Sequence, residues 1–138
     1  MKPLFLKESE VLPAISLNPE IHFFEIKGKS IASDGNLFYN QVLHWLEEYC
    51  QNPNNQTTFN FRLEFFNIYS SKMLLSIIYK LNNLKAAGHD VIINWYYKFD
   101  DDDMLEAGED YAFMVDVPFI FIRESNLEDE VFSAIVND

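Results

Sequence analysis

Apolar and polar positions recur with clear periods along most of this chain. In residues 57–67, "TTFNFRLEFFN", apolar side chains alternate with polar ones, which predicts a strand that buries one face. The segment after Gly35 instead has apolar residues spaced by three and four, at Phe38, Val42, Trp45, Leu46 and Tyr49. This spacing predicts an amphipathic helix that ends near "QNPNNQ".

The second half of the chain continues the alternation of strands and helices. A helical stripe at Leu74, Ile77, Ile78, Leu81 and Leu84 stops at Gly88, a residue type favoured just after a helix. "VIINWYY" is apolar nearly throughout, which predicts a central strand covered on both faces. "MLEAGEDYAFMV" predicts a weaker helix interrupted by Gly108, "PFIFI" a short strand, and "LEDEVFSAIVND" a last helix.

The order of these elements predicts an α/β fold. Near the N-terminus, "LPAISL" and "IHFFEIKG" are extended segments separated by the turn signal "NPE", which predicts a hairpin. We therefore expect residues 1–138 to form a single domain, with a mixed sheet, an N-terminal hairpin and helices packed on it through right-handed crossovers. Loops at the carboxyl ends of parallel strands share one rim, where we expect the functional groups.

Composition and charge narrow the possible partners. The chain has 22 acidic residues against 10 lysines and arginines, a formal charge of −12, which repels nucleic acids and anionic membrane surfaces. No apolar run approaches the length of a membrane span, and "MKPLFLKESE" lacks the apolar stretch of a signal peptide, so we expect a cytoplasmic protein. The single cysteine, Cys50, fits a reducing compartment and a packing role.

Two adjacent serines, Ser70 and Ser71, lie where the strand of residues 57–67 gives way to the second helix. A serine there can accept a hydrogen bond from a free backbone N–H and so cap the helix. The same free N–H groups and the positive end of the helix dipole would also favour a phosphoryl group. Both a capping role and a modification role are open for these serines.

Seven acids fall within residues 100–110, which raises the possibility of a metal site. The spacing does not fit an EF-hand loop, because loop position 5 falls on Met104 or Leu105 and position 12 on Tyr111 or Ala112. The acids would instead complement the dipole of the following helix, and Asp102 and Asp103 could steer a basic partner surface. A small metal-dependent hydrolase built on this loop is the alternative function.

Other catalytic or cofactor-binding patterns are absent from the sequence. The three histidines, His22, His44 and His89, have no zinc-binding spacing, and no G-x-S-x-G, Walker-type or G-x-G-x-x-G pattern occurs. We therefore expect neither an enzyme nor a bound cofactor or metal.

Three segments, "VLHWLEEY", "LEFFNIYSSKMLL" and "NWYYKFDDDDMLEAGEDYAF", resemble the signature segments of the SiaC-like regulatory phosphoproteins. The likeness runs from about Pro13 to Arg123. It implies a fold similar to STAS domains and anti-sigma-factor antagonists. It also implies a partner-switching protein that a kinase phosphorylates and a PP2C-like phosphatase restores. Only the unmodified form would bind the target, which in the characterised branch is a diguanylate cyclase. Separately from the resemblance, we expect a monomer or a weak homodimer.

The chain departs from this family at one informative position. The family usually reads Asn-Thr-Ser-Ser-Ser-Lys across the loop, with the threonine as phosphoacceptor, whereas this chain has Ile68 there. Either Ser70 or Ser71 takes over the modification, or the chain stays permanently competent to bind. Asn67 and Lys72 would frame the loop, and Ile68 and Tyr69 would contact the partner.

Overall fold

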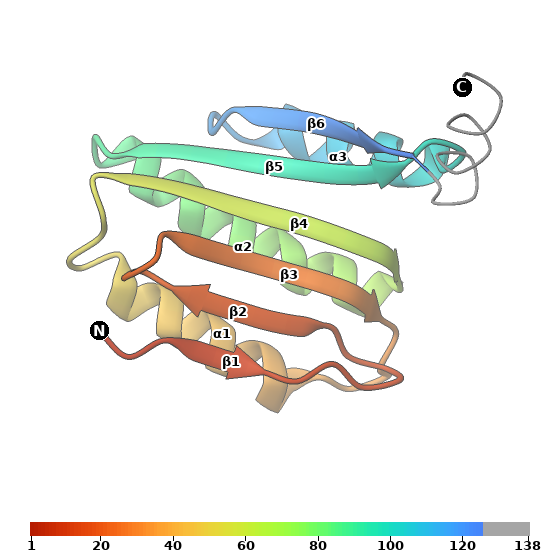
Figure 1. The fold of residues 1–138 in the computed structure, drawn as a ribbon, viewed down its shortest axis with the longest axis horizontal. Helices are drawn as coiled ribbons and strands as arrows, with labels where there is room; N and C mark the ends of the chain where they lie inside the picture. The colour runs from red at the N-terminus through yellow and green to blue at the C-terminus, as the bar shows by residue number, and fades with distance from the viewer. Residues whose placement is uncertain (126–138) are drawn as a thin grey trace, which may run out of the picture.

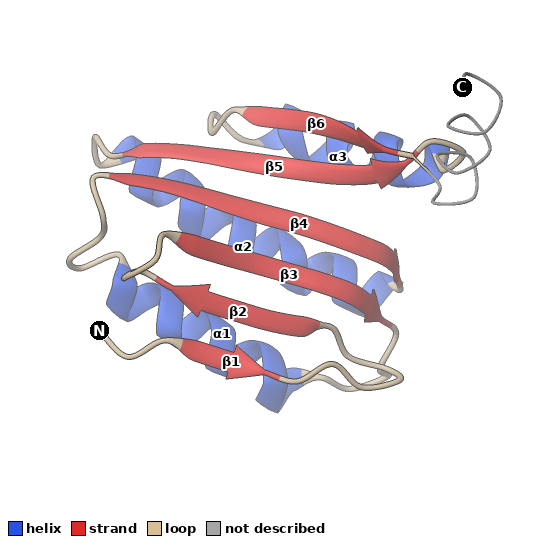
Figure 2. Ribbon diagram, in the orientation of Figure 1, coloured by secondary structure: helices blue, strands red, loops and turns tan. Residues whose placement is uncertain are grey.

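A single layer of helices packs on one face of a mixed sheet, and none of the described helices lies on the other face (Figures 1 and 2). The computed structural model describes residues 1–125. The elements in chain order are β1 (Leu4–Leu6), β2 (Ala14–Asn18), β3 (Phe23–Ser30), α1 (Asn36–Tyr49), β4 (Gln56–Phe66), α2 (Ile68–Ala86), β5 (Asp90–Lys98), α3 (Asp102–Met114) and β6 (Phe119–Glu124).

The strands lie in the sheet in the same order as in the chain. β1, β2 and β3 pair antiparallel, and β3 to β6 pair parallel, with one helix between each parallel pair. The predicted mixed sheet and N-terminal hairpin are therefore confirmed. β1 was not predicted, because a three-residue strand is too short to give a recognisable alternation.

The core lies between the sheet and the helices. Alternate residues of β2 to β5 face the helices, and among them Leu17, Ile26, Phe59, Phe61, Ile93 and Trp95 are fully buried. Trp95 stacks on Phe61 and meets Tyr111 of α3 edge to face. Its predicted place in the core is confirmed.

The prediction that "VIINWYY" is covered on both faces is wrong. In β5, buried Val91, Ile93 and Trp95 alternate with half-buried Ile92, Asn94 and Tyr96. The reason is that α1, α2 and α3 all lie behind the sheet in Figure 1, so that no described element covers its front. We call this uncovered front the open face. The apolar side chains on the open face of β5 are therefore in partial contact with solvent.

The prediction that Gly108 interrupts the third helix is also wrong, because α3 is continuous from Asp102 to Met114. Gly108 is buried against β5, and a Cβ atom there would lie 2.5 Å from the Trp95 indole. The indole Nε1 also donates a hydrogen bond to the Met104 carbonyl at 2.8 Å. The glycine therefore permits close packing of helix on strand, a contact that the periodicity of one segment does not reveal.

The ends of the remaining elements follow the sequence signals. α2 ends at Ala86, and Gly88 follows with φ of +99°, as expected of a residue just after a helix. The last predicted helix, in residues 127–138, lies outside the described residues. None of the described helices is long and apolar enough to span a membrane.

Candidate functional site: the loop at the start of α2

The junction of β4 and α2 is fixed by the side chain of Asn67. Its Oδ1 accepts a hydrogen bond from the Ser70 N–H at 2.9 Å, and its Nδ2 donates to the Ala32 carbonyl at 3.0 Å. Asn67 is therefore the N-cap of α2 and ties this helix to the β3–α1 connection. The prediction that Ser70 or Ser71 caps the helix is wrong, because α2 begins at Ile68 and both serines already lie in its first turn.

Ser70 is buried beneath the start of α2, with 1% of its surface exposed. Ser30 of β3 donates a hydrogen bond to the Ser70 hydroxyl at 2.7 Å, and Tyr39 of α1 bonds to the same Ser30 hydroxyl. Because Ser30 already donates its proton to Ser70, the Tyr39 hydroxyl is the donor to Ser30. Ser70 therefore faces the sheet and is not presented to solvent, as a modified residue would have to be.

Ser71 is less enclosed than Ser70. It is half-buried, and its hydroxyl donates to the carbonyl of Ile68 at 2.6 Å. Its own carbonyl accepts a hydrogen bond from the Tyr111 hydroxyl of α3 at 2.8 Å. The first turn of α2 is therefore joined to α3 by its backbone, while the Ser71 hydroxyl keeps some contact with solvent.

The outermost residues of the loop are apolar and basic. Ile68 is 79% exposed, and Lys72, one helical turn further on, is also exposed. The Tyr69 hydroxyl bonds to Asn36 at the start of α1, next to Leu37, which is 86% exposed. Two exposed apolar side chains, Ile68 and Leu37, thus lie at the N-termini of α2 and α1, which the bond between Tyr69 and Asn36 joins.

The acidic segment lies at the same edge of the sheet as this loop, because α3 also follows the carboxyl end of a parallel strand (Figure 1). Asp101 caps α3 by accepting a hydrogen bond from the Met104 N–H at 3.0 Å, and exposed Asp102 and Asp103 lie in the first turn. The prediction that these acids complement the helix dipole is confirmed. Within residues 1–125, no group of three or more histidine, cysteine or carboxylate side chains could hold a metal ion.

The buried hydroxyls near the loop are neutral donors. Burial raises the pKa of Tyr39, an effect that its hydrogen bond with Ser30 only partly offsets. Burial likewise raises the pKa of Tyr111, which donates to the Ser71 carbonyl. These groups therefore hold the helices in place at neutral pH, and none of them is poised to act as a base.

Sequence reasoning missed the contributions of Ser30, Tyr39 and Leu37 to this site. A signal existed for Tyr39, because a tyrosine on the buried stripe of a helix needs a partner for its hydroxyl. Ser30 and Leu37 carried no comparable signal, because their neighbours come from distant parts of the chain.

Comparisons with known proteins agree with this geometry. The profile of the SiaC family of regulatory phosphoproteins matches residues 6–124. An uncharacterized protein of Pseudomonas aeruginosa strain UCBPP-PA14 is 22% identical over 119 residues, which is 86% of this chain and 94% of that protein.

Solved structures of SiaC from Pseudomonas aeruginosa have the same fold. The apo form superimposes with a TM-score of 0.81 at 22% identity, over 88% of this chain and 99% of that one. SiaC in a crystal with the diguanylate cyclase SiaD, which it activates, gives a TM-score of 0.83 at 21% identity over 88% and 99% of the two chains. The predicted mixed α/β fold is confirmed, whereas the STAS-like character stays a prediction.

Proposed function

This chain belongs to the SiaC family of regulatory phosphoproteins and is a regulator rather than an enzyme, and we propose that it binds a target protein through its α2 rim. The α2 rim consists of residues 67–72 together with Asp102 and Asp103. The proposed target is a diguanylate cyclase, because the related SiaC of Pseudomonas aeruginosa forms a complex with the cyclase that it activates. A kinase and a PP2C-like phosphatase are the proposed controlling partners.

The exposure of Ile68 is the observation that carries this proposal. An isoleucine that is 79% exposed in the first turn of a helix contributes little to folding. Exposed Lys72 lies one helical turn further along α2, and exposed Leu37, Asp102 and Asp103 lie at the starts of α1 and α3, at the same edge of the sheet (Figure 1). Such a mixture of apolar, basic and acidic groups suits a specific protein interface.

Among the hydroxyls of the α2 rim, Ser71 is the proposed acceptor of a phosphoryl group. Ser71 has to release only its hydrogen bond to the Ile68 carbonyl, whereas a kinase could reach Ser70 only by lifting the start of α2 from Ser30. Mass spectrometry after incubation with the kinase of the same genome tests this. The proposal expects the mass gain of one phosphoryl group, lost in Ser71→Ala. No gain in the wild-type protein would instead mean that this chain is permanently competent to bind.

The binding role is tested by placing a charge at the centre of the α2 rim. Ile68→Asp should weaken binding to a diguanylate cyclase of the same genome by about tenfold or more, or about 1.4 kcal/mol, because the carboxylate would be desolvated at the interface. Calorimetry with the purified proteins measures the affinity, and the rate of cyclic di-GMP synthesis measures activation.

Phe113→Asp is the matched control. Phe113 is 92% exposed at the end of α3 that lies away from the rim, so the same kind of change should leave the affinity unaltered. Equal affinities for wild-type and Ile68→Asp proteins would contradict the proposed interface. A loss in both variants would assign binding to a wider surface than the α2 rim.

A further inference from the structure

A β-bulge turns Phe65 outward at the end of β4. The buried residues of this strand alternate, and after Phe61 and Leu63 the next inward position would be Phe65. Instead, Phe65 is 58% exposed, and Phe66 packs edge to face on the Trp95 indole, with ring centroids 6.5 Å apart. The inward position has therefore passed from Phe65 to Phe66.

The register between β3 and β4 shows how this happens. Gly28 pairs with Leu63, and the next residue of β3, Lys29, pairs with Phe65, so that Glu64 is an extra residue in β4. Gly28 has φ of +115°, a conformation that favours glycine. Bulges redirect side chains and are frequent next to functional sites. An aromatic side chain that a bulge directs away from the core is a candidate contact for a partner protein.

Two further exposed apolar residues lie at the same edge of the sheet as Phe65. Val11 is 43% exposed in the β1–β2 connection, and Ile31, directly after β3, is 38% exposed. The Ile31 N–H donates a hydrogen bond to the Val11 carbonyl at 2.9 Å, and the Asn67 N–H donates to the Ser30 carbonyl at 3.0 Å. We call Val11, Ile31 and Phe65 the bulge patch. These backbone bonds place it next to the first residue of the α2 rim.

The turn that carries Val11 is held by hydrogen bonds of its own. The Ser9 hydroxyl accepts bonds from the N–H groups of Val11 and Leu12, at 3.3 and 3.0 Å, and the Ser9 N–H donates to the Leu12 carbonyl at 3.0 Å. An apolar side chain on an ordered turn can be bound without the entropic cost of ordering a loop. The bulge patch is therefore suited to binding in the conformation that it already has.

We propose that the bulge patch and the α2 rim form one continuous binding surface for a diguanylate cyclase, with Phe65 as the apolar anchor. This rests on the proposed function of the α2 rim and adds residues of three further segments to it. Those segments, residues 7–11, 29–34 and 64–68, carry four exposed acids and two exposed lysines. The matching surface of the cyclase would therefore be apolar and bordered by basic side chains.

The small size of the α2 rim supports this extension. Stable protein interfaces bury about 800 Å² on each partner and include about 20–30 residues a side. Residues 67–72 together with Asp102 and Asp103 fall well short of that size. A stable complex that contacts Ile68 therefore requires additional surface around the rim, and the bulge patch adjoins it.

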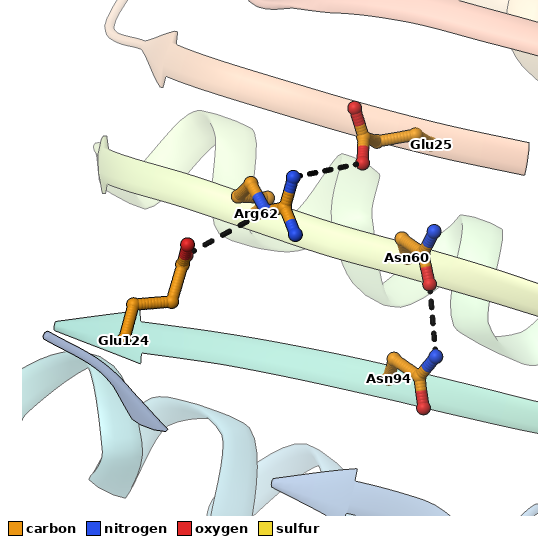
Figure 3. Close-up of polar contacts among 5 residues, drawn as sticks. All are labelled: Glu25, Asn60, Arg62, Asn94 and Glu124. Carbon is orange, nitrogen blue, oxygen red and sulfur yellow. Dashed lines mark hydrogen bonds and ion pairs between the residues drawn. The ribbon is translucent and has the colours of Figure 1, made fainter. Parts of the chain in front are cut away.

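The polar groups of the open face make that face a less favourable extension. Arg62 lies 3.6 Å from Glu25 and 3.5 Å from Glu124, and the Asn94 side chain donates a hydrogen bond to Asn60 at 3.0 Å (Figure 3). These side chains are already paired with one another, and a partner that covered them would have to desolvate three charges. The bulge patch offers apolar side chains without this penalty.

Methyl NMR of the wild-type protein tests the contact without any substitution. The isotope-labelled chain is titrated with an unlabelled diguanylate cyclase of the same genome. The isoleucine methyl signals of Ile31 and Ile68 should shift or broaden. Ile21 is the matched control, because it is 66% exposed in the β2–β3 turn at the opposite edge of the sheet (Figure 1) and should not respond. A response of Ile68 without Ile31, or an equal response of Ile21, would overturn the proposal.

Phe65→Ser tests the anchor. It should weaken binding to the cyclase about tenfold or more, as removal of an apolar side chain at the centre of an interface does. Phe65→Leu keeps an apolar side chain and should retain most of the affinity. Phe113→Ser, at a phenylalanine that is 92% exposed at the end of α3 away from the rim, is the control and should bind like the wild-type protein.

Isothermal titration calorimetry of these variants alongside Ile68→Asp separates this proposal from the one on which it rests. If Ile68→Asp weakens binding and Phe65→Ser does not, the bulge patch is excluded and the α2 rim stands. If neither variant weakens binding, both proposals are overturned. An equal loss in Phe65→Ser and Phe113→Ser would also overturn the bulge patch, because the effect would then not depend on position.

Discussion

Three buried hydroxyls, those of Ser30, Tyr39 and Ser70, join the start of α2 to the sheet and to α1. A buried hydroxyl left without a hydrogen-bond partner costs about 1–3 kcal/mol of stability. Each of the three hydroxyls therefore depends on its hydrogen-bonded neighbour. A carboxylate introduced at Ser70 would be desolvated in the same place. Ser70→Asp therefore tests stability rather than phosphorylation. Substitutions at Ile68 test partner binding, and substitutions at Ser71 test phosphorylation.

Tyr39 makes the stability of the protein fall at alkaline pH. Burial raises its pKa in the folded state, while in the unfolded chain it is near the usual value of about 10. Below about pH 10 both states keep the proton, and the contribution of Tyr39 is complete. As the pH rises from there through the folded-state pKa, the unfolded chain loses its proton first and this stability is lost.

Tyr39→Phe should therefore flatten the decline in the free energy of unfolding above about pH 10. At pH 7 it should cost about 1 kcal/mol, because Ser30 loses a hydrogen-bond donor. Urea unfolding from pH 7 to 11 measures both effects. Tyr79→Phe, which removes the hydroxyl of a tyrosine that is 45% exposed, is the control, and Tyr39→Phe should flatten the slope more than this variant does. An unchanged slope in Tyr39→Phe would contradict the assignment.

At the scale of elements, the position of α2 depends on its cap. Asn67 accepts a hydrogen bond from Ser70 within the helix and donates one to Ala32 outside it. The side chain thus both terminates the helix and fixes its direction relative to the β3–α1 connection. The shape of the α2 rim follows from this one residue.

Replacement of Asn67 should separate these two contributions. Asn67→Ala removes both hydrogen bonds and should lower the free energy of unfolding by about 1–2 kcal/mol. Asn67→Asp keeps the capping acceptor and adds a negative charge at the positive end of the helix, so it should lose less. Chemical unfolding at pH 7 measures the free energy of unfolding of both variants and of the wild-type protein. A larger loss for Asp than for Ala would contradict this prediction, because repulsion between the new carboxylate and the Ala32 carbonyl would then outweigh the retained cap.

For the whole molecule, the position of the acids matters more than the net charge of −12. Charges further apart than about 8 Å are largely screened at physiological salt. The carboxylates at the start of α3 lie at the edge of the sheet that carries the α2 rim, where they would act at close range. Charge at this edge would therefore affect the rate of encounter with a basic partner.

The double variant Asp102→Asn/Asp103→Asn should slow association with a diguanylate cyclase severalfold and make the rate less sensitive to salt. Its cost in stability should be about 1 kcal/mol, because the carboxylates favour the N-terminus of α3. Stopped-flow association at several salt concentrations measures the rate. Glu47→Gln/Glu48→Gln, at the far end of α1, removes the same charge elsewhere. If both pairs slow association equally, net charge and not the rim is responsible.

Sequence periodicity predicted most elements because it is a local property. The stripe from Leu74 to Leu84 and the alternation from Phe59 to Phe65 indicated α2 and β4, and family resemblance located the loop between them. The structural role of Gly108 was predicted wrongly because it depends on close packing against Trp95, which lies in a different element.

The sequence by itself determined the order of most strands and helices and the mixed sheet, because side-chain spacing is set over a few residues. Only the tertiary structure decided that all three described helices lie on the same face of the sheet, that Ser70 is buried beneath α2 and that Ile68 is exposed. Those outcomes depend on contacts among segments far apart in the chain, such as Ser70 with Ser30 and Tyr39, and local spacing carries no information about such contacts.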